Sequence, residues 1–388
     1  MILLDAPYVS DFLKQSVKDL GQSVLETDSA RNLAGDAGLD FVDAIEFSSR
    51  MGRGERVLAN SENALEHVMK CGCQPDLARQ IDICKDKALF RETVASIHPD
   101  YLFRRALFDE LADLDVSGFT CPFIVKPARG FFSLGVHVVD DHGQWPEVVR
   151  AIEQEREAMN AEYPEAVVNA GEFIVEAGIE GEEYAIDVYY NGDGEAVITN
   201  IMHHHFMSDD DISDRLYYTS ARIIRDWLGP FSAYVDKVGK ACGFRDFATH
   251  IEVRVTDAGE IVPIEANPLR FAGWCVADIT YYAWGFNPYE QYFKDLRPDW
   301  DTILKGREDA ATVMVIGDVP SGVDRNRIDS IDYDGFCGMF EDVAELRRID
   351  YTAYPVFAFV FARMDEAGVV ALKSTLVEDF SRFISVRA

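Results

Sequence analysis

The sequence predicts a multidomain α/β (α+β) protein with a small doubly wound domain at its N-terminus. The chain has 388 residues, which is too long for one simple hydrophobic core and suggests two or three domains. Apolar runs of strand length alternate with helical patterns over about the first eighty residues, as in doubly wound units. Further along, strand patterns follow one another and end in a hairpin signal at residues 249–268.

The first domain is expected to span residues 1–84. A helical pattern over residues 9–20 ends at Gly21, and Ser61 is expected to cap a later helix. The domain lacks a Gly-x-Gly-x-x-Gly loop, so we do not predict a dinucleotide site. Its strand patterns lie at residues 2–4, 23–27 and 57–59.

The central region contains a strand that ends on a lysine between two prolines, Lys126. A loop with Gly130, Ser133 and Gly135 follows, and then a further strand, an arrangement that can fold over a ligand. The expected strands of this region are 122–127, 136–139, 172–176, 184–189 and 196–201, and the expected helices are 85–96, 145–162 and 230–242.

The last eighty or so residues predict a β-rich appendage. Residues 311–316 and 356–363 have strand patterns. A turn is expected at 365–368 and a closing helix near 374–384.

The composition limits the possible partners. The chain carries 68 Asp and Glu residues against 37 Lys and Arg residues, a formal net charge of −31. DNA, RNA and anionic membranes repel such a surface, so we expect no nucleic-acid or membrane partner. Any anionic substrate must then meet a local basic pocket. The acidic surface itself has solubility or a saline habitat as alternative explanations.

The cysteines and the hydropathy pattern favour a cytoplasmic location. The seven cysteines are odd in number and scattered, which argues against a disulfide framework. No apolar run reaches the length needed to span a bilayer. Asp5 interrupts the N-terminal apolar stretch too early for a signal peptide.

The hairpin at residues 249–268 is the most informative feature of the chain. If Ala258 and Gly259 form a two-residue turn, their position fixes the register of the two strands. One face of the hairpin is then apolar. Its expected pairs are 255 with 262, 253 with 264, and 251 with 266.

The other face of this hairpin is polar, with Glu252 opposite Glu265 and His250 opposite Asn267. Two carboxylates that face each other across a strand pair repel, and a divalent cation between them removes the repulsion. Carboxylate and amide oxygens, together with phosphate, are the ligands that Mg²⁺ prefers. The alternative is an ordinary surface hairpin that is acidic by chance in an acid-rich chain.

Taken in order, these features resemble the ATP-grasp superfamily, and within it the carboxylate–amine (amino-acid) ligases, over roughly residues 80–300. The resemblance implies an ATP-grasp fold, ATP as the nucleotide, and Mg²⁺, with Mn²⁺ as an alternative, as the bound cation. Lys87 and Lys126 match the two lysines that reach the ATP phosphates in the family. The loop with Gly130, Ser133 and Gly135 matches the glycine-bearing loop that covers those phosphates.

The segment from Glu176 to Tyr184 resembles the adenine-binding hinge of the family. The resemblance implies that Glu176, with the backbone of Ala177 and Ile179, contacts the adenine. It implies that Glu183 contacts the ribose.

The metal-binding acids of the family lie thirteen positions apart on a hairpin, with an asparagine two positions beyond the second. Glu252, Glu265 and Asn267 match all three. Arg270 follows where the family places an arginine that holds a substrate anion, although Leu269 intervenes here.

The resemblance also divides the chain. It implies an ATP-grasp domain at residues 85–300, with a lid lobe at about 97–170 and a core lobe at about 171–300. Residues 301–388 would form a C-terminal α+β domain.

The implied reaction is an ATP-dependent ligation. A substrate carboxylate attacks the γ-phosphorus, and an amine attacks the resulting acyl phosphate, with release of ADP and phosphate. Lys126, Arg254 and Arg270 are the expected catalytic residues, with the two arginines gripping the substrate carboxylate. For Arg254, pairing with a neighbouring acid is an equal alternative.

Several alternatives stay open at this point. The same fold serves synthetases and carboxylases with a thiol or another acceptor, and a non-catalytic nucleotide-binding protein is a further alternative. Small-molecule carboxylate and amine substrates are the expected partners, and a homodimer is not excluded. His203 and His205 share one face of a strand, where they would contact substrate or form a polar lip of the cleft.

Overall fold

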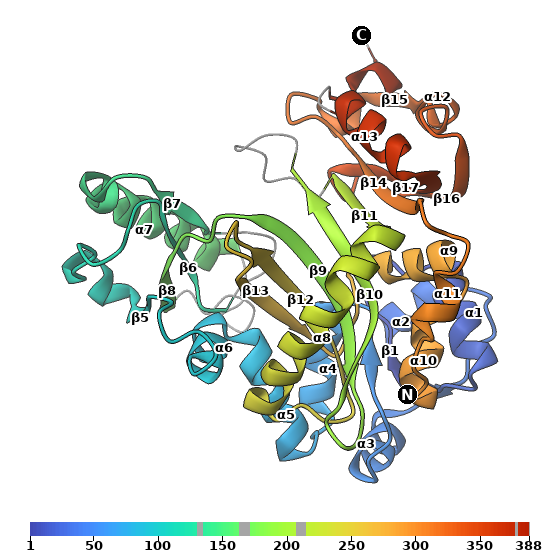
Figure 1. Cartoon of the computed structure of the whole chain (residues 1–388), viewed down its shortest axis with the longest axis horizontal. Helices are drawn as coiled ribbons and strands as arrows, with labels where there is room; N and C mark the ends of the chain where they lie inside the picture. The colour runs from blue at the N-terminus through green and yellow to red at the C-terminus, as the bar shows by residue number, and fades with distance from the viewer. Residues whose placement is uncertain (130–134, 163–170, 207–214, 377–378, 388) are drawn as a thin grey trace.

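The computed structural model describes residues 1–129, 135–162, 171–206, 215–376 and 379–387. Gly130 and Ser133 lie outside the described residues. One long sheet runs through the centre of the molecule (Figure 1). The N-terminal domain lies toward one side of it, and a lid lobe stands away on the other side (Figure 1).

The N-terminal domain contains a parallel sheet with the strand order β3-β2-β1-β4. The predicted strands and first helix are confirmed, whereas the two-residue strand β3 is too short to show a periodicity in the sequence. Ser61 makes no capping hydrogen bond, so the predicted cap is wrong. The elements are β1 (Ile2–Leu3), α1 (Asp11–Asp19), β2 (Val24–Leu25), α2 (Asp28–Ala34), β3 (Phe41–Val42), α3 (Ala44–Gly52), β4 (Leu58–Ala59) and α4 (Leu65–Lys70).

Two helices, α5 (Pro75–Lys85) and α6 (Lys87–Val94), lead from this domain to the lid. The single helix expected at 85–96 is confirmed as α6, but it begins only after Asp86. The Asp86 side chain accepts a hydrogen bond from the N–H of Leu89 and so caps α6.

The lid lobe is built on an antiparallel sheet with the order β5-β8-β6-β7. Its apolar cluster joins Phe123 and Phe173 of the sheet to Trp145 and Ile152 of the helix α7. The elements are β5 (Phe103–Leu107), β6 (Phe123–Pro127), β7 (His137–Val139), α7 (Trp145–Glu162) and β8 (Glu172–Ala177).

The long sheet has the order β13-β12-β9-β10-β11-β14-β17-β16, and every neighbouring pair in it is antiparallel. Strands from residues 301–388 therefore continue the sheet of the core lobe through the pairing of β11 with β14. The strands are β9 (Glu182–Tyr190), β10 (Ala196–His205), β11 (Leu216–Ser220), β12 (Phe247–Val255), β13 (Ile261–Pro268), β14 (Ala310–Asp318), β16 (Asp342–Arg348) and β17 (Val356–Asp365).

The two faces of this sheet have different roles. The helix α8 (Ala221–Cys242) covers one face, where Phe231 and Val235 pack with Ile186 and Val188 of β9. The opposite face carries the alternate residues of the same strands and packs against the N-terminal domain and the short helices α9 (Ile279–Trp284) and α10 (Pro288–Lys294). The short helix α11 (Trp300–Ile303) packs instead into the apolar cluster on the α8 face through Trp300. Among the described residues, no helix combines the length and the apolar character needed to cross a bilayer.

The turn of the β12–β13 hairpin differs from the prediction. Gly259, at φ +79°, donates its N–H to the carbonyl of Thr256 (2.8 Å), and the N–H of Thr256 donates to the carbonyl of Glu260 (3.0 Å). The loop therefore has three residues, with glycine in the left-handed position, instead of two. The predicted pairs 255 with 262 and 253 with 264 are wrong for this reason.

A β-bulge next to Glu252 restores the expected register beyond this point. Glu252 lies opposite Glu265, as predicted, and Ile251 lies opposite Ala266. Asn267 lies opposite His250. The extra residue in the turn and the extra residue in the bulge compensate each other, so the acid pair is confirmed.

Two predictions for the C-terminal residues are wrong. Residues 365–368 are not a turn, because Asp365 caps the helix α13 (Glu366–Thr375) by accepting from the N–H of Gly368. No helix runs over 374–384 in the described residues there, which contain a short 3₁₀ turn at Ser381–Phe383. The remaining elements are β15 (Ile328–Ile331), α12 (Tyr333–Cys337) and β18 (Ile384–Val386).

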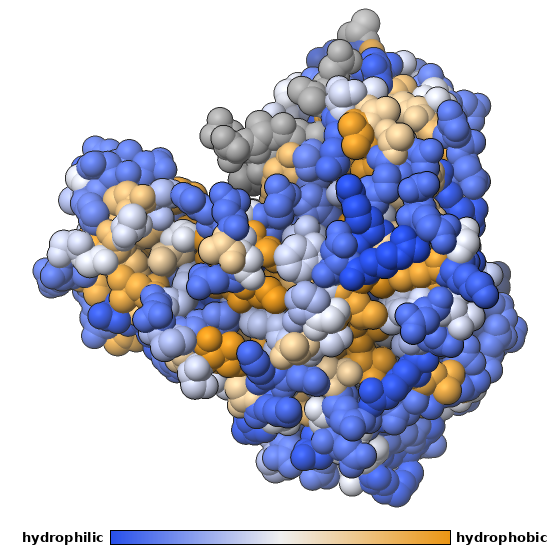
Figure 2. Space-filling model, in the orientation of Figure 1, coloured by the Kyte–Doolittle hydropathy of each residue, from blue (hydrophilic) through white to orange (hydrophobic). Residues whose placement is uncertain are grey.

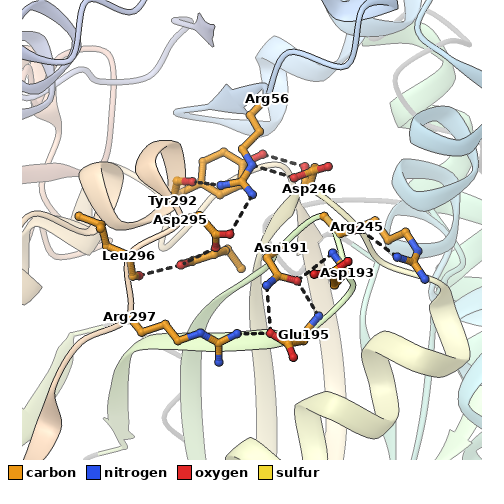
Figure 3. A network of polar contacts seen from close by, with 12 residues as sticks. Arg56, Asn191, Asp193, Glu195, Arg245, Asp246, Tyr292, Asp295, Leu296 and Arg297 are labelled. Atoms are coloured by element: carbon orange, nitrogen blue, oxygen red, sulfur yellow. Dashed lines mark hydrogen bonds and ion pairs between the residues drawn. The ribbon is translucent and has the colours of Figure 1, made fainter.

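Arg56 joins the N-terminal domain to the core lobe (Figure 3). Its guanidinium donates to Asp246 Oδ1 (2.8 Å) and to the carbonyl of Tyr292, and it lies 3.7 Å from Asp295 Oδ2. The Tyr292 hydroxyl donates to the carbonyls of Val57 (3.0 Å) and Asp246 (2.8 Å). These contacts fix the N-terminal domain against the start of β12.

The packing of the hinge against the hairpin leads to a testable prediction. Gly181 has φ +121°, and a Cβ there would lie 2.1 Å from the carbonyl oxygen of Val255. A Cβ at Gly259 meets nothing within 4 Å. We predict that Gly181→Ala lowers the free energy of unfolding by about 2–5 kcal/mol, and that the control Gly259→Ala lowers it by only about 1 kcal/mol. Urea unfolding measures both, and equal losses would contradict the close packing at Gly181.

Candidate active site

The candidate site lies where the lid lobe meets β13, the edge strand of the long sheet (Figure 1). Figure 2 shows a concave surface between the lid lobe and the rest of the molecule. Lys87 begins α6, and Lys126 lies in β6 of the lid. The N–H of Lys87 donates to the carbonyl of Ala128 (2.8 Å), two residues after Lys126. This backbone hydrogen bond holds the start of α6 against the end of β6, which carry the two predicted phosphate lysines.

Glu252 and Glu265 lie on the face of the hairpin that points away from α8. Their side chains are 22% and 26% exposed, so a ligand can reach both. Glu265 Oε2 is 3.1 Å from Lys87 Nζ, and Asn267 Nδ2 donates to Glu265 Oε1 (3.2 Å). The structure thus brings together the three predicted metal ligands and Lys87.

The surroundings shift the pKa values of the two carboxyl groups in opposite directions. Burial raises the pKa of Glu265, but the charges of Lys87 and Lys126 outweigh it and lower this pKa to about 2. For Glu252, burial and the charge of Glu265 both raise the pKa, and His250 offsets them only in part. Glu252 therefore bears the uncompensated part of the repulsion.

His250 connects Glu252 to a buried acid. Its Nδ1 lies 2.7 Å from Asp187 Oδ1, and its Nε2 lies 3.5 Å from Glu252 Oε1. Burial lowers the pKa of His250, but the hydrogen bonds to Asp187 and Glu252 and their charges raise it to about 9. A protonated imidazole between two carboxylates holds the Glu252 side chain in place.

The donor set fits a magnesium nucleotide better than a free metal ion. Within the part of the chain that the structure describes, no group of three or more His, Cys, Asp or Glu side chains is arranged to hold a metal. Two carboxylates and the amide of Asn267 would need phosphate or water oxygens to complete an octahedral shell. Mg²⁺ is commonly bound in this way, and a cation here would relieve the repulsion at Glu252.

Glu176 is the centre of a buried ion cluster. Its side chain is 3% exposed, and its two oxygens lie 2.6 Å from Lys126 Nζ and 2.8 Å from Arg91 Nε. Burial raises the pKa of Glu176, whereas Lys126 and Arg91 lower it to about 2. The Tyr101 hydroxyl donates to the carbonyl of Ala177 (2.7 Å), whose N–H donates to the carbonyl of Leu102 (3.0 Å).

These contacts bear on the predicted adenine-binding residues. The side chain of Glu176 forms ion pairs within the protein, and both backbone groups of Ala177 form hydrogen bonds within it. Their contact with adenine remains a prediction. Gly135, the described member of the predicted phosphate loop, has φ +71°.

Glu183 and Arg254 form a second cluster at the start of β9. Arg254 Nε donates to Glu183 Oε2 (3.1 Å), and Arg254 Nη1 donates to the carbonyl of Ile179 (2.6 Å). His204 Nδ1 lies 2.8 Å from Glu183 Oε1, and its ring stacks on Tyr217 with centroids 4.1 Å apart. Arg254 therefore pairs with a neighbouring acid, as the alternative interpretation expected.

Of the three consecutive histidines, the middle one faces this cluster. His203 instead lies 2.6 Å from Glu182 Oε2 and 3.0 Å from the Tyr218 hydroxyl.

Arg270 has partners in the N-terminal domain. Its Nη2 donates to Glu62 Oε1 (3.2 Å), and Lys85 Nζ lies 2.8 Å from Glu62 Oε2. Burial raises the pKa of Glu62, and Arg270 and Lys85 lower it further than burial raises it. Glu62 also acts electrostatically on Lys87, so this cluster adjoins the acid pair. Arg254 and Arg270 have separate partners within the protein, and their joint contact with a substrate carboxylate stays a prediction.

Several residues of these clusters were not predicted from the sequence, among them Arg91, Asp187, Glu62 and His204. Arg91 and Asp187 each interrupt an apolar pattern, a signal that marks a buried charge with a partner. Glu62 contacts Arg270 only because the N-terminal domain docks on the core lobe, and no local pattern predicts such a contact. The strand alternation places His204 on the face of β10 opposite to His203 and His205, the two histidines that the sequence predicts at the cleft.

Comparison with known proteins identifies the class of the fold. Residues 119–278 match the family model of the ATP-grasp domain. No curated protein sequence matches the chain significantly. Residues 119–278 are therefore similar to an ATP-grasp domain, and the predicted ATP-grasp fold is confirmed.

Solved structures match over the full length of the chain. L-amino acid ligase from Bacillus licheniformis has a TM-score of 0.70 at 17% identity, with 100% of this chain and 98% of that chain covered. Biotin carboxylase from Campylobacter jejuni, in complex with β,γ-ATP, has a TM-score of 0.65 at 12% identity, covering 100% and 92%. N5-carboxyaminoimidazole ribonucleotide synthetase from Thermotoga maritima has a TM-score of 0.62 at 16% identity, covering 100% and 99%. At such identities the likeness is one of fold.

The ion cluster at Glu176 predicts a specific pH dependence of stability. A carboxyl group whose pKa falls from about 4.3 in the unfolded chain to about 2 in the folded chain stabilises the fold above pH 4.3. This contribution, about 3 kcal/mol, is lost as the pH falls through 2. We predict that Glu176→Gln is strongly destabilised at pH 7 and that its difference from wild type shrinks between pH 5 and pH 2.

Urea unfolding at a series of pH values measures this difference. The control is Glu180→Gln, an exposed position four residues further on. A constant difference between wild type and Glu176→Gln from pH 7 to pH 2 would show that the charge of Glu176 contributes nothing to stability.

Proposed function

We propose that the protein is an ATP-dependent carboxylate–amine ligase, which activates a small carboxylic acid as an acyl phosphate and joins it to an amine. The observation that carries the proposal is the pairing of Glu252 with Glu265 across the hairpin, with Asn267 beside them and Lys87 in contact. A protein without phosphoryl transfer has no evident need for a repulsive acid pair at the edge of a lid.

The nucleotide would lie between the lid lobe and the acid pair. Lys87 and Lys126 supply positive charge to its phosphates, although each must loosen its ion pair with Glu265 or Glu176 to do so. Glu252, Glu265 and Asn267 would hold Mg²⁺. When bound, this ion neutralises the developing charge on the β- and γ-phosphate oxygens. Glu183, close to His204 and Arg254, is the candidate for the ribose hydroxyls.

The acid substrate would enter from the side of the N-terminal domain. Arg270 is the cation at the end of β13, and its guanidinium is held by Glu62. A substrate carboxylate beside Arg270 would lie next to the acid pair that would hold the cation, which suits attack on the γ-phosphorus. The amine then displaces phosphate from the acyl phosphate, and closure of the lid limits the loss of this intermediate to water.

The full-length likeness to L-amino acid ligase supports amino acids as the first substrates to test. Fold alone does not determine the acceptor, since biotin carboxylase shares the same fold. The decisive experiment is a phosphate-release screen over pairs of amino acids and small acids, with thiols and bicarbonate as further acceptors. Release only with amines supports the ligase, and release only with thiols or bicarbonate would replace it with another synthetase.

The acid pair leads to a prediction for turnover. We predict that Glu265→Ala lowers the rate of phosphate release by at least about 100-fold, because it removes a ligand of the nucleotide-bound cation. The matched control is Glu260→Ala, an exposed acid of the same hairpin, which should retain the wild-type rate. Circular dichroism should show an unchanged fold in both variants. Equal activity of Glu265→Ala and wild type would refute the assigned metal site.

A second prediction concerns nucleotide binding without turnover. We expect Mg²⁺ to strengthen ATP binding to the wild-type chain, and Glu252→Gln to reduce this strengthening about 10- to 100-fold, because the variant removes one anionic ligand. Isothermal titration with and without Mg²⁺ measures the effect. Binding of ATP that is indifferent to Mg²⁺ in the wild-type chain would contradict the proposal.

A further inference from the structure

The segment between β13 and α9, residues 269–278, follows the metal ligand Asn267 directly and carries Arg270. Three of its non-glycine residues have left-handed backbone conformations, Leu269 (φ 53°), Trp274 (φ 54°) and Cys275 (φ 57°). Each such residue costs about 1–2 kcal/mol relative to an ordinary conformation. Contacts from elsewhere in the fold must therefore hold this segment in shape.

Arg347, from β16 in the C-terminal region, provides such contacts. Its side chain is 1% exposed. Its Nη1 donates to the carbonyls of Cys275 (2.9 Å) and Trp274 (3.2 Å), the two adjacent left-handed residues. Its Nη2 donates to Asp278 Oδ2 (2.6 Å) at the end of the same segment. One guanidinium thus binds the segment at three points.

The environment of Arg347 is fixed by other parts of the chain. Glu345 Oε2 accepts from Arg347 Nε (2.7 Å), and the ring of Phe361 lies 4.4 Å from the guanidinium carbon. Asp278 is fully buried and also accepts from the hydroxyls of Ser10 (2.6 Å) and Tyr289 (2.6 Å). The N-terminal domain, the segment and the C-terminal strands therefore meet in one closed network.

A second contact holds the 269–278 segment closer to the acid pair. The N–H of Ala272 donates to Asp187 Oδ1 (2.9 Å), the oxygen that also binds His250. Arg270 lies in the chain between this point and Asn267. The backbone that carries Arg270 is therefore held by the core sheet on one side and by Arg347 on the other.

We propose that Arg347 is a positioning residue for the acid-substrate end of the site. It holds residues 269–278 in the conformation that directs Arg270 toward the acid pair, so the C-terminal strands act on substrate binding without contacting the substrate. This inference rests on the proposed function, because it assigns Arg270 to the substrate carboxylate. It also assigns a role in catalysis to residues 301–388.

The test compares Arg347→Met and Arg347→Lys with the control Arg348→Ala in the full chain. Arg348 is adjacent on β16, but it is exposed and lies over the ring of Tyr333. We expect Arg347→Met to raise the KM of the acid substrate on the order of 10- to 100-fold and to leave the KM of ATP within about twofold. Arg347→Lys should fall between Arg347→Met and wild type, because a lysine keeps the charge but not the planar fork.

A purely structural role would give a different result. Loss of folded protein lowers kcat in proportion and leaves both KM values unchanged, and that outcome would overturn the proposal. An equal rise in both KM values would overturn it as well. If the Arg347 variants do not fold, Tyr289→Phe removes one hydrogen bond of the network and Glu345→Gln removes the charge of one ion pair with Arg347. Each should shift the acid KM in the same direction by a smaller factor.

Amide hydrogen exchange separates this inference from the proposed function. In Arg347→Met, the amides of residues 270–278 should exchange faster than in wild type and in Arg348→Ala, while β12 and β13 stay protected. Unchanged exchange in this segment would overturn the inference even in an active enzyme. Absence of phosphate release from the wild-type chain with every substrate pair would instead overturn the proposed function, whatever the exchange shows.

Discussion

The repulsion between Glu252 and Glu265 is the constraint around which the central part of the molecule is arranged. The two acids face each other on adjacent strands, and each needs a positive group close to it. The helix α6 brings Lys87 to Glu265, and His250, held by Asp187, adjoins Glu252. The lid, the helix and the sheet therefore meet where their charges compensate, and the same place suits a nucleotide bound together with a divalent cation.

The sequence predicted the acid pair correctly although part of the reasoning behind it was wrong. A two-residue turn was assumed, whereas the structure has a three-residue turn with Gly259 in the left-handed position and a bulge beside Glu252. The two extra residues cancel, so the register at Glu252 is the predicted one. Periodicity predicts which residues share a face, but the turn type depends on backbone conformations that the residue pattern Asp-Ala-Gly-Glu does not determine alone.

Most strands and the order of the chemical motifs followed from local patterns, and the fold could be predicted from them. The partners of the motif residues could not. Glu62 reaches Arg270, and Arg347 reaches Asp278, from positions more than sixty residues away, through the docking of one part of the chain on another. Such pairs depend on tertiary packing, which residue spacing does not encode. The same holds for α13. The local sequence predicts a turn at Asp365, whereas Asp365 caps the helix, because capping and turn residues are of the same types.

The continuity of the long sheet has a consequence for the evolution and handling of this chain. The strand β11 is paired along its length with β14, so the region after residue 300 supplies backbone hydrogen bonds to the core lobe. A fragment that stops before β14 would expose the unpaired N–H and C=O groups of β11 as an open edge, which favours aggregation. The C-terminal region is thus no detachable module. Recombination that exchanges the C-terminal region between relatives must preserve the pairing of β11 with β14.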